Sequence, residues 1–445
     1  MRISNFKLSR LTKTEKISNF ITHPLFSGSA IMIVGSNSAS ALNYLYHLII
    51  GRLLGPIFYG ELAALISVIG LLGIIPAAVS LVIVKQISSA KDEKEINNLI
   101  IWFKAKMFIV SLIFSMLVLI SSPSISSFLH ISRITYLLSI SLFFLFSLQA
   151  GFNRAILQGL LKFKELVITL LAENAVKLIT SVLLILAGFA VGGAVSSFLI
   201  ASFLGLYLTN YYLKIKSRSI PQVSSNLKPM LMLTVPILIQ SVSITSLYSS
   251  DVVLVKHFFS SHEAGIYAAL STLGKIIFFG AGPISAVMFP LVSKQSSKGE
   301  NYKKVLIYSF AATTLFAISI CFIYWLIPNF AINLLFGSAY LESSKLLIWF
   351  GIFITLFTLS SLLINFGISL SKNRIVIFPL VSAILQIILI SFFHQTIFTV
   401  IIISIGVTAL LLLTLLIYLC FGKGLIYGKN ISKRDKFNLN NRPGI

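Results

Sequence analysis

Three charged side chains lie deep inside strongly apolar stretches of this sequence, where they could hold a charged ligand. Lys177 and Lys275 each lie about eleven residues into such a stretch, and Glu173 precedes Lys177 by four residues. Residues four apart share a helix face. Glu173 and Lys177 therefore form either a structural ion pair or a site in which Glu173 is a proton- or cation-coupling group. Lys275 has no acid within one helical turn, which favours a ligand-binding role for it.

The balance of these charges indicates the ligand that they suit. A charged side chain at the centre of a membrane helix costs about 2.5–3.5 kcal/mol on insertion scales, so it needs a partner or a water-filled cavity. Two lysines against one glutamate favour an anionic ligand such as a phosphate or pyrophosphate, which lysine binds as a point charge. Lys275 and Lys177 are therefore our first candidate substrate-binding residues.

Further polar residues lie on the first and seventh apolar stretches. Asn43 and His47 are four residues apart and share a helix face, so they are candidate substrate contacts. Arg52 and Asp251 fall near the outer ends of their stretches, where interfacial anchoring is the favoured interpretation. Arg52 is kept as a candidate substrate contact, and Asp251 is kept as a candidate coupling residue.

A weak internal repeat predicts where the chain bends. Residues 59–65 (YGELAAL) resemble residues 264–270 (AGIYAAL), and both open an apolar stretch. Pro76 follows the first segment, and Gly282 and Pro283 follow the second, so we predict hinges at these three residues. Gly- and Pro-interrupted spans at matching places in two halves favour a binding site beside them. The other interpretation is that Gly and Pro are simply frequent in transmembrane helices.

The amino-acid composition indicates the class of protein in which these residues lie. Of 445 residues, 57% are hydrophobic and only 11% are charged, whereas ordinary soluble domains have roughly 25% charged residues. This excludes a soluble globular enzyme, a disordered chain and a disulfide scaffold. Cys321 and Cys420 both lie in apolar runs and indicate neither a metal site nor a disulfide framework.

The apolar stretches predict an all-α integral membrane protein with twelve transmembrane helices, since each stretch is long enough to cross a bilayer. The repeat divides these helices into two six-helix bundles of the same orientation, related as parallel repeats. We expect an N-terminal arm at 1–27, a first bundle at 28–213, a linker at 214–228, a second bundle at 229–421 and a basic tail at 422–445. The predicted spans are 28–51, 61–84, 99–122, 134–157, 166–187, 191–213, 229–252, 264–291, 304–327, 344–370, 375–393 and 397–421.

The net charge of +23 is mostly a topology signal. When the twelve predicted spans alternate from a cytoplasmic N-terminus, 29 of the 35 Lys and Arg residues fall on the cytoplasmic side and four on the outer side. Such an excess follows the positive-inside rule and predicts that both termini are cytoplasmic. A nucleic-acid partner is therefore not expected. The connecting loops are too short for a soluble catalytic domain, and no ATP-binding Walker A loop is present. We expect a transporter without a cofactor.

A nine-residue motif between the first two spans carries a family resemblance. Residues 52–60 read RLLGPIFYG, which resembles the R-x-L-G-P-x-x-Y-G turn of Wzx-type oligosaccharide flippases. These belong to the multidrug/oligosaccharidyl-lipid/polysaccharide exporter superfamily. Residues 263–267 (EAGIY) resemble the matching turn of the family's second half. The resemblance implies two six-helix bundles that form a V around a central cavity. Related lipid II flippases carry a cationic residue in the eighth span, where Lys275 lies.

The resemblance also implies a function and partners. It implies alternating-access translocation of polyprenyl-(pyro)phosphate-linked oligosaccharide for surface polysaccharide biosynthesis. It further implies a bacterial or archaeal inner (plasma) membrane, contact with membrane lipids and a polysaccharide polymerase partner. One alternative is a cation-coupled multidrug exporter of the same superfamily, which needs a buried acid in the first or seventh span. The other alternative is a membrane-embedded polysaccharide polymerase or glycosyltransferase, which usually presents a larger outer loop.

Overall fold

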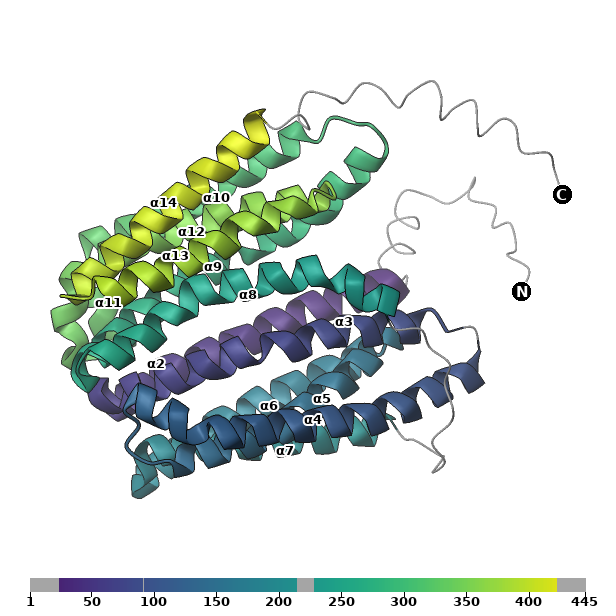
Figure 1. Cartoon of the computed structure of the whole chain (residues 1–445), viewed down its shortest axis with the longest axis horizontal. Coiled ribbons are helices and arrows are strands. Elements are labelled where there is room, and N and C mark those ends of the chain that lie inside the picture. Colours follow the sequence, from purple (N-terminus) through teal and green to yellow (C-terminus); the bar gives the residue numbers. More distant parts are fainter. Residues whose placement is uncertain (1–23, 91, 214–227, 422–445) are drawn as a thin grey trace, which may run out of the picture. The chain divides into compact units, whose positions relative to one another are not determined.

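Apolar stretches of this length must fold as helices, because only a helix or a closed barrel satisfies every backbone polar group inside lipid. The computed structural model describes residues 24–90, 92–213 and 228–421. In these residues every regular element is helical, which confirms the predicted all-α class (Figure 1). The greater part of the expected N-terminal arm and of the linker, and the whole basic tail, lie outside the described residues.

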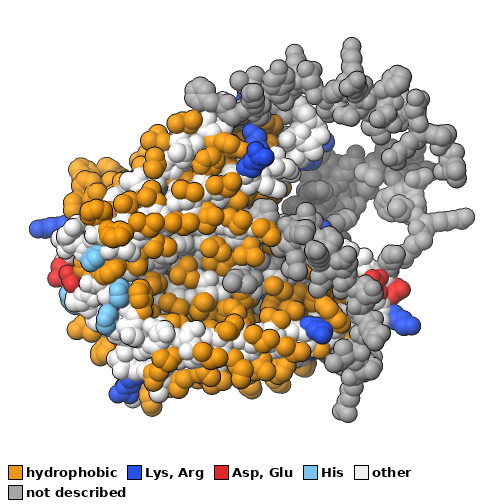
Figure 2. Space-filling model, viewed as in Figure 1, with side chains coloured by type: hydrophobic (Ala, Val, Ile, Leu, Met, Phe, Trp, Pro, Cys, Tyr) orange, Lys and Arg blue, Asp and Glu red, His pale blue; other side chains and the backbone are white. Residues whose placement is uncertain are grey.

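The described helices account for all twelve predicted spans. Among the described residues, ten segments are long and apolar enough to cross a membrane. Phe163–Leu213 contains two predicted spans, whereas Val34–Leu72 contains most of the first span and about half of the second, which continues in the helix Ile74–Ser88. Figure 2 shows hydrophobic side chains over most of the visible face, with charged side chains mainly toward its edges. Such a surface suits lipid contact, since a soluble protein rarely exposes continuous apolar area on this scale. The chain is therefore a multi-pass membrane protein.

The chain divides into two compact units. Unit 1 comprises Met1–Leu62 and Leu72–Val235, and unit 2 comprises Ala63–Leu71 and Pro236–Ile445. The helices of unit 1 are α2 (Pro24–Leu72, whose residues from Ala63 to Leu71 group with unit 2), α3 (Ile74–Ser88), α4 (Glu93–Leu129), α5 (Thr135–Gly159), α6 (Phe163–Leu184), η1 (Ile185–Phe189) and α7 (Ala190–Leu213). In unit 1, α7 packs against both α5 and α6, and α4 packs against α5.

The predicted turn between the first two spans is a kink inside α2. Gly55 has φ 70° and ψ 175°, a backbone conformation that residues with a Cβ rarely adopt. Pro56 follows directly and begins the second helical part, where its missing N–H and fixed φ carry no penalty. The Gly-Pro pair of the RLLGPIFYG motif is thus what lets one apolar helix end and the next begin.

Unit 2 contains a capping box that fixes the start of one of its helices. Its helices are α8 (Lys228–Phe258, whose residues before Pro236 group with unit 1), α9 (Ser261–Ser297), α10 (Lys303–Leu326), α11 (Pro328–Leu335), η2 (Ser338–Ser343), α12 (Ser344–Ser369), η3 (Asn373–Val376), α13 (Ile377–Phe392) and α14 (Ile397–Phe421). Ser260 and Glu263 form a capping box at the start of α9, in which each side chain bonds the other residue's backbone N–H. Within this unit α12 packs against α9, α10 and α14.

The two units share a distinctive turn. The turn after α5 and the turn after α12 each contain a non-glycine residue in the left-handed region, Leu161 (φ 58°) and Ser371 (φ 59°). In both turns the amide of the next residue donates to the carbonyl five residues back, at 2.9 Å from Lys162 and 3.0 Å from Lys372. This is the Schellman pattern of helix ends. The same pattern ends α4, where His130 has φ 50° and the Ile131 amide donates to the Ser126 carbonyl at 3.0 Å, so it is a general way of ending helices in this chain.

The predicted hinges have different outcomes in the two repeats. α2 ends at Leu72 and α3 begins at Ile74, so the expected break is present just before Pro76, which lies in the first turn of α3. In contrast, α9 runs from Ser261 to Ser297 without interruption, and the expected break at Gly282 and Pro283 is absent. A proline is tolerated within a membrane helix when neighbouring groups compensate for its missing donor. A hinge role for the three residues stays a prediction.

Candidate substrate-binding site

Lys275 lies in the middle of α9 and is partly exposed. Its Nζ lies 5.3 Å from the centroid of the Tyr248 ring, a cation–π distance. In the part of the chain that the structure describes, the ion pairs within 4.0 Å are Arg154–Glu173 and His262–Glu342, so Lys275 is in neither. The Lys275 ammonium therefore has an aromatic neighbour and no direct acidic partner among these residues, which leaves it able to bind an anion.

The carboxylate of Asp251 interacts with the charge of Lys275. The two groups interact electrostatically without forming a close ion pair. Asp251 is fully buried, and its carboxylate accepts bonds from the Tyr267 hydroxyl at 2.7 Å and from the Val252 amide at 2.9 Å. α8 continues for seven residues past Asp251, to Phe258, so Asp251 does not lie at the end of its helix, and its predicted anchoring role stays a prediction.

Aromatic rings from three helices pack beside Lys275. The centroid of Tyr248 lies 5.7 Å from that of Phe278 and 5.8 Å from that of Phe357. Phe278 and Phe357 are themselves 4.9 Å apart. Rings at these separations form favourable aromatic pairs. The cluster joins α8, α9 and α12 and fixes the Tyr248 ring against which the ammonium lies.

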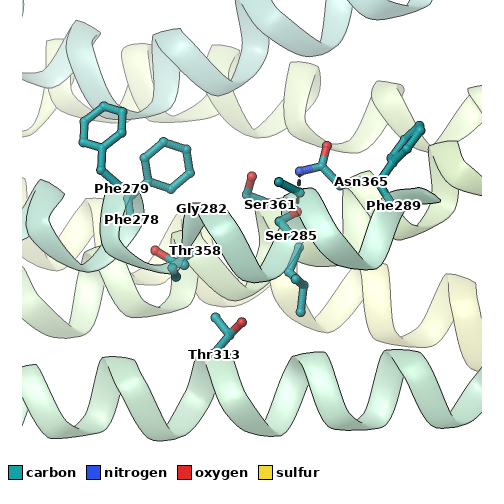
Figure 3. Close-up of a pocket in the computed structure, with 12 residues that line it drawn as sticks. Phe278, Phe279, Gly282, Ser285, Phe289, Thr313, Thr358, Ser361 and Asn365 are labelled. Atoms are coloured by element: carbon teal, nitrogen blue, oxygen red, sulfur yellow. Dashed lines mark hydrogen bonds between the residues drawn. The ribbon is translucent and has the colours of Figure 1, made fainter. Parts of the chain in front are cut away.

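A cavity of about 430 Å³ lies within unit 2, next along α9 from Lys275. Lys275, Phe278, Gly282 and Ser285 recur at helical spacing, so Lys275 shares the face of α9 that lines the cavity. No lining residue is charged, and the sequence analysis proposed only Gly282 of the set. The cavity is lined by Phe278, Phe279, Ala281, Gly282, Ser285, Ala286 and Phe289 of α9, Thr313 of α10, and Thr358, Ser361, Leu362 and Asn365 of α12 (Figure 3).

Lys177 belongs to unit 1 and has its own polar contacts. Its Nζ donates to Asn43 Oδ1 at 2.5 Å and to Asn174 Oδ1 at 3.1 Å. It also lies 4.9 Å from the Tyr46 ring and 5.2 Å from the Phe198 ring. Lys177 is 8% exposed, so this is a largely desolvated cation held by amide oxygens and aromatic faces. The structure thus brings together two of the predicted substrate contacts, Lys177 and Asn43.

A structural ion pair between Glu173 and Lys177, one of the two interpretations of the sequence, is not formed within 4.0 Å among the described residues. Glu173 pairs instead with Arg154 of α5, whose Nε also donates to Thr169 Oγ1 at 3.1 Å. Arg154 falls within the predicted span 134–157 and lies five residues before the end of α5. A Cβ on Gly205 of α7 would overlap Glu173 Oε2 and lie 3.0 Å from Arg154 Nη2, so the absent side chain makes room for the pair.

The remaining predicted contacts lie on α2. His47 Nδ1 is 3.2 Å from the Tyr59 hydroxyl, so His47 joins the two parts of the kinked helix and is not bonded to Lys177. Arg52 is exposed, nine positions along α2 from Asn43. Within unit 1, the hydrogen bonds described above bring Lys177 and Asn43 together and do not join His47 or Arg52 to them. Lys275 belongs to unit 2, where it lies beside the cavity.

No metal centre is formed by the described residues, among which no three His, Cys, Asp or Glu side chains gather in a group that could hold an ion. Cys321 and Cys420 are both free thiols. Cys321 Sγ lies 3.3 Å from Thr355 Oγ1, a contact between α10 and α12. The two sites offer charge, hydrogen bonds and aromatic contact to a ligand.

The fold identifies the class of protein. A multidrug resistance MATE family transporter of the MOP superfamily, solved in an inward-facing conformation, matches with a TM-score of 0.70. The two chains are 14% identical, and the match covers 86% of this chain and 94% of that one. The lipid II flippase MurJ, in an inward closed conformation, matches with a TM-score of 0.67 and 18% identity, over 87% of both chains. The chain thus has the fold of these MOP-superfamily proteins, as the RLLGPIFYG resemblance implied.

The family follows from the sequence comparisons. A family model described as polysaccharide biosynthesis protein matches residues 49–345, about two thirds of the chain. This chain belongs to that family. An uncharacterized membrane protein of Methanocaldococcus jannaschii is 27% identical over 289 residues, which cover 60% of this chain and 67% of that protein. The matched family region begins on α2, contains Lys177 and Lys275, and ends at Lys345 of α12.

Proposed function

We propose that this protein is a flippase that moves polyprenyl-(pyro)phosphate-linked oligosaccharide across the cell membrane for surface polysaccharide biosynthesis. The observation that carries the proposal is Lys275, a partly exposed ammonium in mid-helix with no acid within 4.0 Å among the described residues. A cation kept inside a membrane helix is costly and is typically retained for a substrate or an ion. The membership in a polysaccharide biosynthesis family supports a glycan-bearing substrate.

Lys275 would bind the phosphate of the lipid carrier. Its ammonium has three donors, and the Tyr248 ring covers one side of it, so the remaining donors can point to phosphate oxygens. Asp251 interacts electrostatically with Lys275, while its own oxygens bond Tyr267 and Val252. The polyprenyl tail would stay in lipid. Lys177 and Asn43 of unit 1 remain candidate substrate contacts.

The cellular setting is part of the same proposal. The excess of Lys and Arg on one side of the predicted topology supports an inner (plasma) membrane protein with both termini in the cytoplasm. The parallel repeat supports alternating access as the transport mechanism. A polysaccharide polymerase acting on the translocated glycan would be the downstream partner.

We expect Lys275→Ala to reduce the rate of glycolipid translocation by about tenfold or more. A hydrogen bond to a charged group contributes about 1.5–3 kcal/mol, and 1.4 kcal/mol corresponds to a factor of ten. The measurement is a leaflet-resolved assay in proteoliposomes, in which a membrane-impermeant reagent detects polyprenyl-linked oligosaccharide on the far surface. Lys345→Ala removes an exposed lysine of α12 and serves as the matched control.

Two results of this assay would count against the proposal in different ways. Absence of translocation by the wild-type protein would contradict the flippase function. Translocation that is equally fast in Lys275→Ala and Lys345→Ala would contradict the role of Lys275 while leaving the flippase function intact.

Cation-coupled multidrug export is the second candidate function, and one observation favours it. Such an exporter needs a buried acid in the first or seventh span, and Asp251 of α8 is fully buried. The expected result under this hypothesis is extrusion of a cationic dye from vesicles, driven by a Na⁺ or H⁺ gradient and lost in Asp251→Asn. Dye extrusion that persists in Asp251→Asn, or that is absent from the wild type, would contradict it.

A further inference from the structure

One buried hydroxyl group faces the unit 2 cavity without a partner. Thr313 of α10 is 1% exposed and lines the cavity, and its Oγ1 has no hydrogen-bond partner among the described residues. Buried polar groups are almost always hydrogen-bonded, so an orphaned one calls for an explanation such as a missing ligand or water. Figure 3 shows Thr313 on a different helix from the other labelled polar residues, across the cavity from Thr358. The cavity therefore offers an unused hydrogen-bonding group.

A chain of hydrogen bonds between amide and hydroxyl groups orients the Asn365 side chain in the cavity wall. Gln240 Nε2 donates to Asn365 Oδ1 at 2.8 Å, and Asn365 Nδ2 donates to Ser285 Oγ at 3.0 Å. These two bonds fix the direction of the Asn365 amide. An amide nitrogen has two hydrogens, and a serine hydroxyl that accepts a bond can still donate its own. Asn365 and Ser285, both of which line the cavity, thus keep donors for a ligand (Figure 3).

The rest of the lining defines the ligand's chemical class. Phe278, Phe279 and Phe289 supply aromatic faces, and none of the twelve lining residues is charged. A lining of aromatic side chains with a few placed polar groups is typical of small-molecule sites. A neutral sugar ring fits this chemistry, because its C–H faces can lie on aromatic rings while its hydroxyl groups bond amides and hydroxyls. A lipid tail would leave the polar groups unpaired.

We propose that this cavity is the subsite for a neutral sugar ring of the lipid-linked glycan. The assignment rests on the proposed function and specifies which part of the substrate unit 2 recognises. Phe278 and Gly282 lie three and seven residues after Lys275, about 4.5 and 10 Å along the helix axis at 1.5 Å per residue. A phosphate held by Lys275 would therefore place the sugar attached to it at the Phe278 end of the cavity.

The first experiment compares two probe lipids bound to the full-length protein in nanodiscs. The probes are polyprenyl phosphate that carries one neutral hexose and the same lipid without sugar. We expect Asn365→Leu to weaken binding of the hexosyl lipid about tenfold, and Thr313→Val to weaken it severalfold, with no change for the bare lipid. Lys275→Ala should weaken both. Thr314→Val is the matched control, because Thr314 is the adjacent threonine, does not line the cavity and bonds the Phe310 carbonyl.

A second experiment tests the subsite without any lipid. In a variant with both native cysteines replaced by serine, Ser361→Cys places a thiol in the cavity wall, and its rate of maleimide labelling is measured. A neutral methyl hexoside should slow the labelling, and a negatively charged methyl uronide should slow it less.

The outcomes separate the subsite from the proposed function. Equal weakening of both lipids by Asn365→Leu, or failure of a panel of neutral hexosides to protect the thiol, would overturn the sugar subsite. Binding of neither lipid by the wild type, together with protection of the thiol by hexosides, would support the subsite and contradict the flippase function.

Discussion

Arg154→Met is expected to lower the free energy of unfolding by about 3 kcal/mol, because it leaves Glu173 as an unpaired carboxylate among packed helices. The two side chains are 15% and 19% exposed, so water screens the remaining charge only weakly. This value is at the low end of the range for broken buried ion pairs, in keeping with that residual exposure. The pair joins α5 to α6, and its loss should also loosen α7, which packs on both helices.

The physical reason lies in the closeness of three helices around the pair. Arg154 bonds both Glu173 and Thr169 of α6, and Gly205 presents its bare backbone from α7. Gly205→Ala would press a methyl group onto the same atoms from the third helix. It should therefore destabilise unit 1 in the same direction as Arg154→Met, although both charges remain.

A double substitution distinguishes a charge effect from a packing effect. In Arg154→Met/Glu173→Leu no charge is left unpaired, so most of the lost stability should return, as it does when apolar pairs replace buried ion pairs. The measurement is reversible unfolding in mixed micelles titrated with SDS, followed by circular dichroism. Arg133→Met replaces an exposed arginine of unit 1 and is the control. A double variant no more stable than Arg154→Met would contradict the ion-pair explanation.

The transmembrane spans were predictable because they depend only on the length and apolarity of a continuous stretch of sequence. A run of about 20 apolar residues is what lipid requires, whatever the tertiary packing, and all twelve predicted spans fall on helices. Helix ends were not predictable in the same way, since a helix continues past the hydrocarbon region where polar residues satisfy its backbone. α4 begins at Glu93 with Asp92 as its cap, well before the predicted span at 99–122. α8 likewise continues to Phe258, seven residues past Asp251, which is fully buried.

Of the candidate substrate-binding residues, only the charged ones could be predicted from the sequence. Lys275 and Lys177 stood out because an isolated charge in an apolar run demands an explanation. Their partners depend on which faces of which helices meet, which spacing along one helix does not reveal. The shared face of Glu173 and Lys177 therefore suggested a pair, whereas the structure joins Glu173 to Arg154 and Lys177 to Asn43. The polar residues of the cavity, such as Thr313 and Asn365, carry no signal that distinguishes them from ordinary helix-packing groups.

Lys177→Met is expected to separate function from stability: translocation should fall by about tenfold or more, while the free energy of unfolding should stay unchanged or rise. Moving an ammonium out of water costs several kcal/mol per ion, and Lys177 has no ion-pair partner within 4.0 Å in the described chain. Its two amide partners and two aromatic neighbours offset only part of that cost. A methionine of similar length would fill the space between the Tyr46 and Phe198 rings without the charge.

The Asn43 and Asn174 amide oxygens, which lose a hydrogen bond in Lys177→Met, remain accessible to water. Asn43 is exposed and Asn174 is partly exposed, so water can replace the lost bonds and the penalty for unpaired acceptors should be small. Lys164→Met, at an exposed lysine of the same helix, is the control and should change neither quantity. Unfolding in SDS and glycolipid translocation are measured on the same preparations. If Lys177→Met lost stability but transported normally, Lys177 would be a structural link between α6 and α2. If it lost only transport, its charge would be retained for the substrate, because nothing in the packing of unit 1 would require it.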